Sequence, residues 1–150
     1  MTIQELHTKA MEMADRADDL KRQGIIDEAE QLYRQAMDNE RSAALMARDQ
    51  HTGEPTESVL LRSAASLAYC AHDYREAERL VCLALSGNPP GEIADELRSL
   101  FDSISMERNM AQMSIGSSSN EQENITITLP IKERNLLHVL VRKFGWACVF

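Results

Sequence analysis

Apolar and small residues recur three and four positions apart along most of the first hundred residues, a spacing that predicts helices with one buried face. The clearest example is the stretch from residue 60 to residue 100. Its pattern is interrupted at His72-Asp73, resumes in a new phase and ends at residues 87–89. Two helices joined by so short a turn must lie antiparallel. The small residues on their shared face, which would let the two backbones approach closely, are Ala65, Ala68, Ala77 and Ala84.

The chain before this stretch carries the signals of two further helices. A first helix is predicted after Thr2, because Glu5 follows three residues later in the capping-box arrangement. Gly24 ends this helix. The next helix begins at the acidic residues 27–28, whose carboxylates stabilise the positive end of the helix dipole, and is expected to continue through Ala47.

Two more boundaries complete the expected helical body. Residues 48–55 are predicted to form a helix end and a loop, after which Thr56 or Ser58 would cap the next helix. A last helix is predicted from Glu92 to Ile104, directly after two prolines. In an array of stacked helices such a last helix covers the end of the body.

The composition changes after residue 105. Residues 106–124 include a run of glycine, serine and asparagine and are predicted to be a flexible linker. Residues 125–150 read as a strand with strict alternation, an amphipathic helix over 131–144 and a short second strand. We therefore expect a mainly α protein, with antiparallel helical hairpins over residues 1–105 and a small strand-helix-strand module at 125–150. Because such a module is marginal alone, it is expected to pair with a second copy, with another protein or with the helical body.

Residues 24–37 and 72–85 share a sequence frame built around Glu-Ala-Glu, 48 positions apart. An internal repeat with a period of roughly 20–50 residues is typical of a stacked helical array. The frame resembles the second half of a tetratricopeptide-repeat (TPR) unit. The matching positions are Ala29 with Ala77, Tyr33 with Val81 and Ala36 with Ala84, and Pro89 matches the closing proline. The chain departs from the family in having only two units and in an inserted region at 41–56, which lengthens the usual repeat of ~34 residues.

This resemblance implies a non-catalytic scaffold that binds a protein or peptide partner. In a TPR-like array the leading helix of each hairpin lines the concave face, so the candidate partner-binding residues are Arg16, Lys21, Arg62 and Tyr69. These side chains could hold an acidic or extended peptide. The alternative interpretation is that Arg16 and Arg62 only solvate a helix face, since isolated exposed charges usually contribute little energy.

Charge is distributed unevenly along the chain. The net charge is −8, which argues against nucleic acid as the partner of most of the chain. Residues 125–150 hold four basic residues against one acidic residue, a net charge of +3, which leaves −11 for the remainder. A basic tail on an acidic body can dock on that body, on another chain or on nucleic acid.

The tail supports a second interpretation of the protein. A strand followed by an amphipathic helix resembles the opening of ribbon-helix-helix repressors and short segments of bacterial antitoxins. Thr126 and Thr128 would then face the DNA major groove, and Lys132 and Arg134 would contact phosphate. That motif requires a second helix, and the sequence ends at Phe150. The alternative function is therefore an antitoxin- or repressor-like regulator whose tail pairs with a toxin, a second copy or DNA.

Residues that could carry chemistry are scattered. The four histidines and three cysteines lie at no metal-ligand spacing, and we expect no metal, no cofactor and no catalysis. The cysteines are expected to be buried packing residues. An odd, unpaired set of cysteines and the lack of a leader segment are typical of a reduced cytoplasmic protein. No apolar run approaches the ~20 residues that a membrane helix needs.

Overall fold

The computed structural model describes the backbone of residues 1–116 and the side chains of residues 1–111. This part of the chain is mainly helical. Its five helices are α1 (Ile3–Arg22), α2 (Ile26–Asp49), α3 (Thr56–Cys70), α4 (Tyr74–Leu85) and α5 (Gly91–Gly116). The predicted strand-helix-strand module at 125–150 and residues 117–124 of the predicted linker lie outside the described residues and stay predictions.

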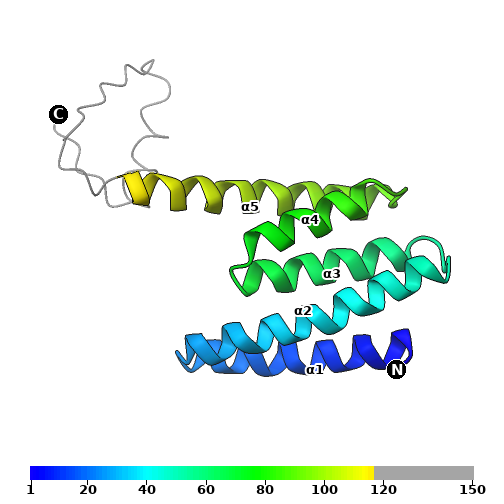
Figure 1. The fold of residues 1–150 in the computed structure, drawn as a ribbon, viewed down its shortest axis with the longest axis horizontal. Coiled ribbons are helices and arrows are strands. Elements are labelled where there is room, and N and C mark those ends of the chain that lie inside the picture. Colours follow the sequence, from blue (N-terminus) through cyan, green and yellow to red (C-terminus); the bar gives the residue numbers. More distant parts are fainter. Residues whose placement is uncertain (117–150) are drawn as a thin grey trace, which may run out of the picture. The chain divides into compact units, whose positions relative to one another are not determined.

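The helices run back and forth, each packed against the next in chain order (Figure 1). The third helix is the centre of this body, because it packs on α2 on one side and on α4 on the other, and it also contacts α5. Within residues 1–116, no helix combines the length and the apolar character that crossing a bilayer requires.

The turns of the two hairpins have the same backbone geometry, 48 positions apart. Gly24 and His72 both take a left-handed conformation, with φ of 80° and 56°. The next residues, Ile25 and Asp73, have φ and ψ of −87° and 71° and of −86° and 69°. The amide of Ile25 bonds to the Leu20 carbonyl at 3.0 Å, and the amide of Asp73 makes the equivalent bond at 2.9 Å. The two turns, 48 positions apart, therefore have the same local backbone geometry.

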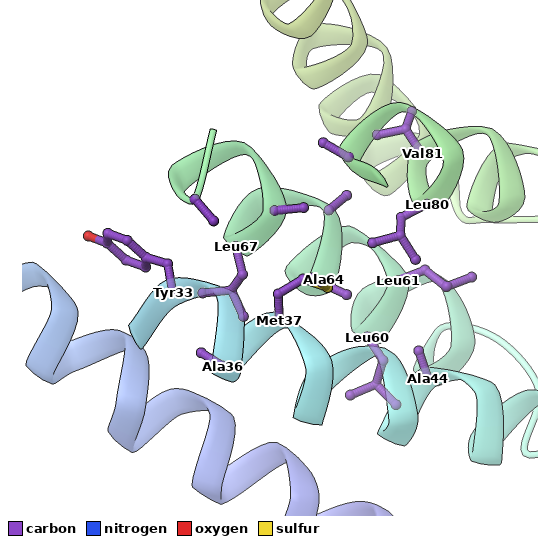
Figure 2. Close-up of a cluster of buried hydrophobic side chains, with 14 of the residues drawn as sticks. Tyr33, Ala36, Met37, Ala44, Leu60, Leu61, Ala64, Leu67, Leu80 and Val81 are labelled. Atoms are coloured by element: carbon purple, nitrogen blue, oxygen red, sulfur yellow. The ribbon is translucent and has the colours of Figure 1, made fainter. Parts of the chain in front are cut away.

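Alanine dominates the interface between the helices. The four alanines predicted to let the backbones approach are each at most 2% exposed: Ala65, Ala68, Ala77 and Ala84. We call these four residues the alanine ladder. Figure 2 shows larger side chains of the same core, from Tyr33 and Met37 on α2 through Leu60 and Leu67 on α3 to Val81 on α4. Small side chains at the contact let two helix axes lie close together, and the leucines fill the remaining space.

The start of α1 agrees with the sequence prediction, and the structure adds a cap at α4. The Thr2 hydroxyl accepts a hydrogen bond from the Glu5 amide at 3.2 Å, and the Glu5 carboxylate accepts one from the Thr2 amide at 2.7 Å, which confirms the capping box. The Asp73 carboxylate caps α4 by accepting from the Glu76 amide at 3.1 Å.

The start of α3 differs from the prediction. Neither Thr56 nor Ser58 caps this helix, because both lie inside it. The Glu54 carboxylate takes that role instead and accepts from the amide and the hydroxyl of Ser58. A glutamate two residues before the helix can reach its free amides as well as a serine can, and it adds a negative charge at the positive helix end.

The last helix is longer than the sequence predicted. It continues beyond Ile104 to Gly116, so residues 106–116, which we expected to begin the linker, are helical. No glycine or proline interrupts the chain between Gly91 and Gly116, and helix propagation therefore meets no local barrier.

A candidate binding groove

A groove of about 380 Å³ lies across α1, α3 and α5, and we call it the odd-helix groove. Its apolar lining comes from all three helices: Met11, Ala14, Leu67 and Leu100. On α1 and on α5 the lining residues are three or four positions apart, so that they share one face of their helix. Ligand pockets on proteins usually enclose about 300–1,000 Å³, and this groove lies at the lower end of that range.

The polar lining of the groove contains one ion pair between two helices. The Arg62 guanidinium of α3 pairs with the Glu96 carboxylate of α5, and their side chains are 31% and 55% exposed. Ser63 and Ser66 add two hydroxyls from α3. An ion pair so open to water stabilises a fold by about 0–1 kcal/mol, so either charge can exchange its partner at little cost.

A buried polar cluster lies directly beside the groove. Glu40 of α2 is 0% exposed, and its two carboxylate oxygens lie 3.0 and 2.9 Å from Nδ1 of His7 on α1. Ser63, which lines the groove, lies close enough to the same carboxylate to stabilise its charged form. Side chains of three helices therefore meet at one carboxylate at the edge of an otherwise apolar core.

Burial raises the pKa of Glu40 above its ordinary value, and the polar groups of His7 and Ser63 oppose that rise. Desolvation penalises the charged form of a carboxyl group, whereas donors stabilise it. The net direction is upward, which means that burial is the larger effect here.

The sequence interpretation missed this cluster. Glu40 stands on the same helical stripe as Ala36, Ala43 and Ala44, all of which are buried. The sequence did offer one signal of this cluster, a charged residue on an otherwise apolar face of a helix. Every position on such a face is buried when the face packs against another helix. Its partner His7 lies 33 residues away, and nothing local to α2 indicates which residue would face it.

The structure brings only one of the four sequence-predicted binding residues into the groove. Arg62 lines it, whereas Arg16 and Lys21 lie exposed on α1 outside its lining. Lys21 instead lies near the thiol of Cys70, where its charge partly opposes the rise in pKa that burial causes.

Tyr69 also lies outside the groove lining and packs against Tyr74, with 5.6 Å between the ring centroids. Burial, followed by the charge of Glu107, raises the pKa of Tyr69. Its hydroxyl therefore stays protonated at neutral pH and can serve as a donor.

The two cysteines in the described part of the chain differ in environment. Cys70 is half-buried and Cys82 is exposed, so the expectation of buried packing cysteines is wrong for Cys82. Both thiols are free. Among residues 1–111, no three histidine, cysteine, aspartate or glutamate side chains gather in a way that could hold a metal ion.

Comparison with known proteins finds no matching family model, no matching curated protein and no matching solved structure. The residues of this chain and their arrangement therefore carry the functional argument.

Proposed function

We propose that this protein is a non-catalytic scaffold that binds a segment of a protein partner in the odd-helix groove. The observation that carries the proposal is the groove itself, in which three helices that are not consecutive share one apolar hollow beside an exposed ion pair. Apolar surface in a hollow provides binding energy, and a charge at its edge provides orientation.

The proposal includes a TPR-like arrangement of the helices. The pairs α1–α2 and α3–α4 would be two repeated hairpins, and α5 would be a third leading helix that closes the array. Two features support this view: the turns of the two pairs share their dihedral angles and hydrogen bonds, and the groove is lined by leading helices alone.

The lining also suggests what the partner segment contains. An apolar side chain would occupy the space between Met11, Leu67 and Leu100. A neighbouring carboxylate would pair with Arg62 and displace Glu96, because guanidinium groups prefer the planar geometry of carboxylates. The free thiols of Cys70 and Cys82 support a reducing compartment such as the cytoplasm.

Two matched variants test the groove in the full chain. Ser66 and Ser42 are both exposed helical serines whose hydroxyls donate to the carbonyl four residues earlier, at 3.0 and 2.7 Å. Ser66 lines the groove and Ser42 does not. Ser66→Arg fills the hollow and adds a cation beside Arg62, whereas Ser42→Arg makes the same chemical change elsewhere.

The measurement is quantitative mass spectrometry of proteins captured by each variant from the cells that make this chain. We expect the wild type and Ser42→Arg to enrich the same protein, and Ser66→Arg to lose it while its circular dichroism stays unchanged. Equal capture by all three proteins would contradict binding in the groove.

A further inference from the structure

A second groove, of about 460 Å³, lies between α2 and α4, and we call it the even-helix groove. Leu80 of α4 contributes a buried side chain to it, only 3% exposed. Leu45 of α2 lines the same groove with 42% of its surface exposed, and Leu83 is half-buried there. A single exposed leucine needs no explanation on its own. Here, however, an exposed leucine and a hollow with apolar lining occur side by side on one surface.

The charged residues around this groove alternate in sign. Both oxygens of Glu76 are used, one by Arg41 at 3.0 Å and the other by Arg79 at 2.7 Å. Arg41 also pairs with Asp38 at 2.9 Å. Two arginines thus balance two carboxylates, and the patch is locally neutral in a chain whose net charge is −8. A second copy of this acidic chain would meet little net repulsion at such a patch.

We propose that the even-helix groove is the interface of a homodimer, with Leu45 of each copy entering the groove of the other over Leu80 and Leu83. In a two-fold symmetric interface the same patch faces itself, so it must carry both a protruding side chain and a hollow that accepts it. Its charges must also be self-complementary. Arg79 and Asp38, whose side chains are 73% and 55% exposed, meet that requirement by pairing across the interface.

This inference is independent of the proposed partner binding, because the two grooves share no lining residue and no helix. The dimer leaves the odd-helix groove of each copy unchanged. A failure of one proposal therefore says nothing about the other.

The test is the molar mass of the full chain, measured by light scattering and by sedimentation equilibrium over a wide range of protein concentrations. We expect a dimer in equilibrium with monomer. Leu45→Glu should raise the dimer dissociation constant by at least about 100-fold, because each interface loses two buried leucines and gains two carboxylates in an apolar hollow. Helicity should stay unchanged, because Leu45 is exposed in the single chain.

Ile26→Glu is the matched control. Ile26 is also an apolar residue of α2 and is 45% exposed, but it does not line the groove. The control variant should dimerise as the wild type does. A wild type that is monomeric at every concentration overturns the proposal. A dimer that Leu45→Glu leaves intact also overturns it, and would place the contact elsewhere on the chain.

Discussion

The contact between Glu40 and His7 allows a stability prediction with a clear magnitude. A fully buried carboxylate that loses its main donor leaves an unsatisfied polar group, which costs about 1–3 kcal/mol. Loss of one partner from a fully buried ion pair costs more, about 3–5 kcal/mol, but the His7 side chain is 34% exposed, so that water can partly replace it. We therefore expect His7→Ala to lower the free energy of unfolding by about 2 kcal/mol, a sizeable part of the ~5–15 kcal/mol of a typical domain.

The measurement is urea unfolding followed by circular dichroism at neutral pH, on His7→Ala, Glu40→Gln and the double variant. The double variant completes a mutant cycle, and we expect a coupling energy of about 1–2 kcal/mol between the two positions. Met11→Ala is a useful control, because it removes a half-buried side chain of α1 that makes no polar contact in the cluster. A coupling energy below about 0.5 kcal/mol, the usual limit of additivity, would refute the contact.

The pH dependence of the same variants tests the raised pKa of Glu40. A carboxyl group with a raised pKa in the folded state binds its proton more tightly there than in the unfolded chain. Its stabilising contribution is complete below the ordinary glutamate pKa of 4.5 and is lost as the pH rises through the raised folded value. The wild type should therefore lose stability relative to Glu40→Gln over that interval, with a slope of at most about 1.4 kcal/mol per pH unit. Parallel curves for the two proteins across this range would show that the folded state does not raise the pKa.

Three further predictions concern single side chains of the body. Ala77→Glu should abolish cooperative thermal unfolding, because a carboxylate has no room and no donor at a position that is 0% exposed; a native-like melting curve would contradict the alanine ladder. Asp73→Ala should lower stability by about 1 kcal/mol in urea unfolding through loss of the α4 cap, whereas Asp73→Asn should retain most of it. Tyr33→Phe removes a hydroxyl that bonds to the Asp18 carboxylate, and it should cost about 1 kcal/mol, since Asp18 is exposed and is rehydrated; a larger loss would mean that the hydroxyl has a second role.

Periodicity predicted those parts of the fold that depend on local chemistry. The alanine ladder follows from spacing alone, because a small residue on an apolar stripe is buried wherever the stripe packs. The capping box at Thr2 likewise needs only two residues three positions apart. The end of α5 was misjudged for the opposite reason. Sparse apolar residues after Ile104 suggested a linker, but helix propagation needs no apolar stripe, and residues 105–115 contain no glycine or proline that would oppose it.

The candidate sites were harder to predict because they depend on register between helices. Arg62 was identified because it lies on a leading helix, but its ion pair with Glu96 and its place in a hollow require α5 to lie against α3. Glu40 and His7 meet only when α1 and α2 pack in one particular register. Sequence spacing determines which residues share a face of one helix, and it leaves open which faces meet.

The alternation of antiparallel helices separates the two proposed interactions. Helices α1, α3 and α5 line the odd-helix groove, and helices α2 and α4 line the even-helix groove. A dimer joined through α2 and α4 therefore carries two open odd-helix grooves. For a partner with two suitable segments, such a dimer would bind about 10²–10⁴-fold more tightly than a single groove does. Leu45→Glu would remove this gain without changing the affinity of one groove for a single segment. The two effects of one exposed leucine, on molar mass and on avidity, should therefore appear together, because both depend on the same contact between copies.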